Sequence, residues 1–158
     1  MDLEIDENPD IDDRISKIEE ELPEYVTFLP YLMDVGDNKR LVYGEDIFTV
    51  KKELKEYDVA YQELEIENEV PVLSNYSVEI VAPSLWLGAE FVIENWDELV
   101  RLFEVLATIY AAKVASGKIE LEIISEKSDG SISQIKFEGH PEELEKVPDE
   151  LKEVVQGD

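Results

Sequence analysis

The fold follows first from residues 96–123, which read WDELVRLFEVLATIYAAKVASGKIELEI. The first part of this stretch predicts a long helix, because Asn95 stands as an N-cap residue and Glu98 occupies the third helical position, as in a capping box. Apolar residues recur on nearly every side of that helix, and Gly117 is placed to end it. We therefore expect one long apolar helix over 96–116.

The second part of the stretch predicts a β-strand, because apolar residues and glutamates alternate over 119–123. A period of two places every other side chain on the same face of a strand. Asp129-Gly130 then supplies a turn signal, and Ile135 and Phe137 resume the alternation. These residues predict a β-hairpin that follows the long helix.

Two amphipathic helices are predicted near the ends of the chain. The first begins after Asn8 and ends before Pro23. Its apolar stripe consists of Ile11, Ile15, Ile18 and Leu22. The second is built from two similar seven-residue patterns, over 141–147 and 148–154, and we expect Pro148 to kink it where it packs on the sheet.

The middle of the chain predicts a further hairpin, two strands and two short helices. Apolar runs over 25–33 and 40–43 flank a turn at 34–38, which indicates the hairpin. A helix over 47–57 carries the only basic cluster of the chain, Lys51, Lys52 and Lys55, which we expect to pair with nearby acids. The remaining predictions are strands over 61–70 and 76–80 and a short helix over 85–93.

Together these elements predict an α+β fold. We expect a mixed or antiparallel sheet of about five to six strands, packed against one long apolar helix, with short amphipathic helices at the N- and C-terminal ends. Strands do not alternate regularly with helices, which disfavours a doubly wound parallel sheet. We expect residues 1–24 to form an acidic helix or arm and residues 25–158 to form a single α+β domain.

Charge is the strongest compositional feature of the chain. The 158 residues include 40 acidic and 14 basic residues, and the net charge is −26. The acids are grouped: residues 1–24 contain 11 acids and two bases, and no Lys or Arg occurs between Lys55 and Arg101. A surface of this charge repels phosphate groups and anionic lipid, so we expect neither direct nucleic acid binding nor membrane binding.

The sequence predicts no catalytic or cofactor site. Without cysteine the chain has no thiol nucleophile and no thiolate metal ligand. The single histidine, His140, is expected to mark the entry to the last helix. The seven glycines are scattered and form no phosphate-binding loop. We therefore expect no enzyme activity and no cofactor.

A calcium-binding loop is also excluded by the residues present. Asp6, Asn8 and Asp10 match the opening of such a loop. Ile11 and Lys17, however, occupy the positions that require glycine and a bidentate glutamate. We therefore expect no resident metal.

Two acidic surfaces are candidates for binding a partner. The first is one face of the strand over 61–70, whose carboxylates have no basic residue within their own segment; it comprises Glu63, Glu65, Glu67 and Glu69. The second is the polar face of the first helix, which comprises Asp12, Asp13, Glu19 and Glu20. A homodimer is expected through the long helix, at Leu99, Leu102, Phe103, Leu106 and Tyr110.

These patterns favour a cytoplasmic, non-enzymatic binding protein. Rows of carboxylates complement a cationic groove, so the first hypothesis is an inhibitor or immunity-type protein that neutralises a basic protein such as a nuclease or DNA-binding protein, in the extreme as a nucleic-acid mimic. The alternative is an assembly or adaptor subunit that acts through apolar helix surfaces. Salt dependence separates them, because charge-driven binding weakens steeply with salt.

Overall fold

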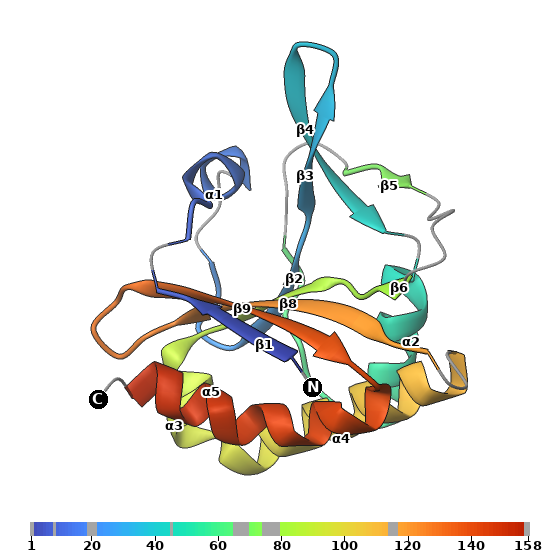
Figure 1. Cartoon of the computed structure of the whole chain (residues 1–158), viewed down its shortest axis with the longest axis vertical. Coiled ribbons are helices and arrows are strands. Elements are labelled where there is room, and N and C mark those ends of the chain that lie inside the picture. Colours follow the sequence, from blue (N-terminus) through green and yellow to red (C-terminus); the bar gives the residue numbers. More distant parts are fainter. Residues whose placement is uncertain are drawn as a thin grey trace.

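The structure is a computed structural model and describes residues 2–7, 9–18, 22–44, 46–64, 70–73, 80–113 and 117–156. The described residues form an α+β fold around a mixed sheet (Figure 1). Its strands run in the order β1 (Asp2–Asp6), β9 (Ile132–Gly139), β8 (Ile119–Glu126), β7 (Ser84–Leu87) and β2 (Val26–Leu29). β7 pairs with β8 in parallel, as does the short β6 (Ile80–Val81), and the other neighbours are antiparallel.

Helices cover one face of this sheet (Figure 1). This layer contains α3 (Ala89–Glu94), α4 (Trp96–Lys113), the 3-10 helix η1 (Pro141–Lys146) and α5 (Val147–Gln156), with α2 (Ile47–Glu56) beside α4. The alternating strands β8 and β9 direct Leu121, Ile123, Ile135 and Phe137 into the main core beneath these helices. Burial of this apolar surface is the main driving force for the fold.

The other face of the sheet is covered only in part. The hairpin of β3 (Tyr31–Val35) and β4 (Asn38–Gly44) stands away from the sheet on this side, together with β5 (Val72–Leu73) and α1 (Asp12–Ile18) (Figure 1). A second, smaller core joins them to the sheet and contains Ile11, Ile18, Leu29, Leu41, Trp86 and Ile124. The part of this face over β1, β9 and the first half of β8 carries charged side chains instead.

Several predicted elements are confirmed. The α+β class, the mixed sheet and the hairpin after the central helix agree with the sequence analysis. The hairpin around the turn at 34–38 and the helix that begins at Ile47 are also present. The last helical segment changes at Val147, from a 3-10 helix to an α-helix, and it packs against α3 and α4.

The central helix differs from its prediction. α4 has 18 residues and is amphipathic, because Arg101, Glu104 and Thr108 lie on an exposed stripe. Its apolar side is wide because the sheet and the C-terminal helices contact it together. The prediction of a helix that is apolar on nearly every side is therefore not confirmed.

The predicted helix over 85–93 is also wrong in its first part. Leu85, Trp86 and Leu87 belong to β7, which lies between β2 and β8, so both faces of the strand are buried. A strand buried on both faces loses the alternating pattern and resembles a buried helix in sequence. Gly88 separates β7 from α3, and its N–H donates to the Tyr25 carbonyl at 2.8 Å.

The N-terminal segment contributes a strand to the main sheet. β1 pairs with β9 along its whole length, from Asp2 opposite Glu138 to Asp6 opposite Gln134. The predicted strand over 61–70 is not formed where the structure describes it, since residues 61–64 belong to no helix or strand. Residues 65–69, and residues 76–79 of the other predicted strand, lie outside the described residues.

Candidate functional site

Two rows of charged side chains cross the open face of the sheet. In the first row Asp2, Glu138 and Glu120 are direct neighbours on β1, β9 and β8. In the second row Glu4, Lys136 and Glu122 are neighbours in the same way. The residues between them in sequence, such as Phe137 and Leu121, face the helical layer, so the strand alternation places the charged groups on one side.

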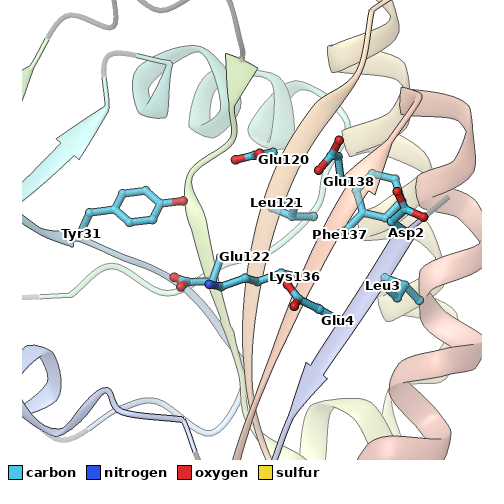
Figure 2. A pocket seen from close by; sticks show the side chains of 10 residues that line it. All are labelled: Asp2, Leu3, Glu4, Tyr31, Glu120, Leu121, Glu122, Lys136, Phe137 and Glu138. Carbon is cyan, nitrogen blue, oxygen red and sulfur yellow. The ribbon is translucent and has the colours of Figure 1, made fainter.

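These rows line a hollow in the surface (Figure 2). A cavity of about 460 Å³ is bounded by both rows and by Tyr31 of β3. The strand residues that stand between the charged ones in sequence, Leu3, Leu121 and Phe137, complete its lining. A second cavity, of about 500 Å³, runs on along β1 and shares Glu4 and Lys136 with the first. The hollow therefore presents five carboxylates and one ammonium group. We call Asp2, Glu4, Glu120, Glu122, Lys136 and Glu138 the acidic face.

One carboxylate of the acidic face is already paired within the chain. Glu122 accepts hydrogen bonds from Arg14 Nη1, Ser84 Oγ and Gln134 Nε2, each at 2.6 Å. Burial would raise the pKa of Glu122. The Arg14 charge and the three hydrogen bonds outweigh burial, so the pKa of this carboxyl lies below its ordinary value. Glu122 is therefore a charged structural group.

The Arg14 side chain joins α1 and the β3–β4 hairpin to the sheet. Its Nε donates to the Pro30 carbonyl at 2.7 Å, and its guanidinium lies 5.0 Å from the centre of the Tyr31 ring. Tyr31 in turn donates to the Ala82 carbonyl at 2.7 Å, and burial, with the Glu122 charge, raises the pKa of its hydroxyl. These contacts fix the wall of the hollow beside the carboxylates.

The structure describes only some of the acidic residues that the sequence analysis selected. Glu63 is exposed beside α2, and Lys51 Nζ lies 2.7 Å from its carboxylate, so a basic residue of another segment neutralises it. This contact agrees with the expectation that the basic cluster pairs with acids. Three members of that set, Glu65, Glu67 and Glu69, lie outside the described residues.

The predicted acidic face of the first helix is described in part. Asp12 and Asp13 stand exposed in the first turn of α1, and Asp13 lies 3.8 Å from Lys39 of β4. Glu19 and Glu20 lie outside the described residues. The acidic face on β1, β8 and β9 was not selected from the sequence, although the alternation of Glu120 and Glu122 was visible there.

The predicted dimer surface is covered by the chain itself. The five side chains are at most 2% exposed within one molecule and contact its own sheet and helices; they are Leu99, Leu102, Phe103, Leu106 and Tyr110. As folded, these residues are not available to a second copy.

The other chemistry considered from sequence has a structural explanation or is absent from the described part. His140 lies at the N-cap of η1. Its backbone N–H donates to Glu143 Oε1 at 3.1 Å, and its Nδ1 lies 3.1 Å from the Gly117 carbonyl. Among the residues that the structure describes, no group of three or more His, Cys, Asp or Glu is arranged to hold a metal ion. No helix in this same part is long and apolar enough to cross a membrane.

No protein-family model matches the chain, and neither the curated proteins nor the solved structures contain a match.

Proposed function

We propose that this chain is a non-enzymatic acidic binding protein, of inhibitor or immunity type, which neutralises a basic protein such as a nuclease or a DNA-binding protein. The acidic face is the surface that we propose for binding. A cationic partner would place lysine and arginine side chains among carboxylates that normally face water.

The observation that carries the proposal is the row of Asp2, Glu138 and Glu120. Neighbouring strands lie roughly 4.8 Å apart, so three like charges stand side by side on one face. Like charges directly opposite each other destabilise a sheet. A basic partner would remove this repulsion on binding and would form charge-assisted hydrogen bonds with the same groups.

The net charge of −26 supports the same proposal through the rate of association. A field of one sign steers a partner of opposite charge towards the surface and raises its association rate. The alternative of an adaptor acting through apolar helix surfaces has less support, because the α4 residues that suggested it are buried in the core.

A displacement assay with two matched variants tests the proposal. The face variant carries Asp2→Asn, Glu120→Gln and Glu138→Gln, all at exposed positions of the acidic face. The control variant carries Glu104→Gln, Glu145→Gln and Glu153→Gln, at exposed positions of the helical layer. Both variants remove three carboxylates, so they have the same net charge.

The probe is a panel of basic nucleases and DNA-binding proteins, each bound to a labelled DNA duplex. We expect the parent protein and the control variant to displace the duplex from at least one panel member, and the face variant to require at least about tenfold more protein. Equal weakening in both variants would contradict the proposal, since net charge alone would then explain the effect. Displacement from no panel member would also contradict it.

A further inference from the structure

The two edges of the main sheet are closed differently. At the β2 edge, Gln62 N–H donates to the Val26 carbonyl at 2.8 Å, and Thr27 Oγ1 donates to the Gln62 carbonyl at 2.6 Å, so the irregular segment is bonded to that strand at Gln62. At the other edge, β1 pairs with β9 alone among the described residues, and the described backbone hydrogen bonds of Asp2 to Ile5 include none to the outer side of the strand. β1 therefore offers a strand edge for pairing.

The side chains of β1 determine which side chains would fit on a strand that pairs with its outer edge. Asp2 and Glu4 project onto the acidic face, whereas Leu3 and Ile5 project towards the helical layer. Leu3 packs against the main core, but Ile5 is 45% exposed although it faces the apolar side. A strand added beside β1 would cover Ile5 with its own apolar side chains and would place its other side chains beside the carboxylates.

Protection against unwanted pairing does not account for the whole acidic face. Charged residues on an edge strand discourage aggregation, and Asp2 and Glu4 serve that purpose. Glu138 and Glu120, however, continue the same row onto β9 and β8, which are interior strands with no edge to protect. The extra carboxylates extend the negative surface inward from the open edge.

We propose, resting on the function proposed above, that the basic partner binds by adding an extended segment to the outer edge of β1. The segment has lysine or arginine at alternate positions, which face the carboxylates, and apolar residues between them, which cover Ile5 and the edge of the core. Backbone hydrogen bonds to β1 supply affinity, and the alternation supplies specificity. A second copy of β1 does not fit, because it would bring its own Asp2 and Glu4 to the acidic face.

Three synthetic peptides test this mode of binding without changing the protein. The first is acetyl-RVRVRVR-amide, and the second has the same composition in blocks, acetyl-RRRRVVV-amide. The third repeats the alternating sequence with every backbone nitrogen methylated, so that it keeps its charges but cannot donate backbone hydrogen bonds. Affinity is measured by fluorescence polarisation, and amide hydrogen exchange of residues 2–6 is measured by NMR.

The alternating peptide is expected to bind at least about tenfold more tightly than the other two and to slow amide exchange within β1. Equal binding of the three peptides, or tighter binding without slower exchange in β1, would overturn strand addition. Neither of those results affects the displacement assay with the face and control variants, so a failure of strand addition is distinguishable from a failure of the proposed function.

Discussion

At the scale of single residues, the pair of Arg14 and Glu122 connects the stability of the fold with the acidic face. Both side chains are largely buried, with 9% and 14% of their surfaces exposed. A buried ion pair adds little net stability over an apolar pair of the same shape, but the loss of one partner leaves an uncompensated charge. We therefore expect the loss of one residue of the pair to lower stability more than the replacement of both residues together.

Arg14→Met is expected to lower the free energy of unfolding by roughly 3–5 kcal/mol, because Glu122 would remain buried without its counter-ion. The double variant Arg14→Met with Glu122→Gln should recover part of that loss, since the amide carries no charge. Urea denaturation of the parent, both single variants and the double variant measures the coupling. Additive losses in the double variant would show that the two residues act independently.

The pH dependence of stability gives a second test of the same carboxyl. Because its folded-state pKa is lowered, the stabilisation from Glu122 is fully present above the unfolded-state pKa of about 4.3 and is lost as the pH falls through the folded-state value. The stability difference between the parent and Glu122→Gln should therefore shrink from about pH 6 to about pH 3. A difference that stays constant across this range would contradict the assignment of Glu122 as a charged group.

At the scale of elements, the sequence pattern predicts those strands and turns that depend on neighbouring residues in the chain. The alternation over 119–123 and the turn at Asp129-Gly130 were sufficient for the hairpin of β8 and β9. The strand β7 was mistaken for a helix because burial on both faces removes the period of two. The acidic face could not be predicted, since it depends on Asp2 pairing beside Glu138, and nothing local to either residue specifies that contact.

The junction between β7 and α3 depends on Gly88. A Cβ atom at this position would collide with the Glu24 carbonyl oxygen, so a side chain would push apart the two backbone segments. We expect Gly88→Ala to destabilise the protein by roughly 1–3 kcal/mol, measured by thermal or urea unfolding. Glu94→Ala, at an exposed position of α3, is the control and should have little effect. Unchanged stability in Gly88→Ala would mean that the backbone contact is not as close as described.

At the scale of the whole molecule, the chain buries the apolar side of α4 and exposes many of its charged side chains. The α4 side chains that predicted a dimer are buried, and the open β1 edge carries acids that repel a second copy. We therefore expect the isolated protein to scatter light as an 18.1 kDa monomer at micromolar concentration. A stable dimer whose mass does not change on dilution would show that another surface joins two copies.

The central claim is that the acidic face, and not net charge alone, captures a basic partner. Its most direct test is the association rate of a labelled eight-residue arginine peptide with the parent, the face variant and the control variant, measured by stopped flow over a range of salt concentrations. The account predicts that the face variant associates about tenfold more slowly than the control variant at low salt, and that the difference shrinks as salt is added. Equal rates for the two variants at low salt would contradict it.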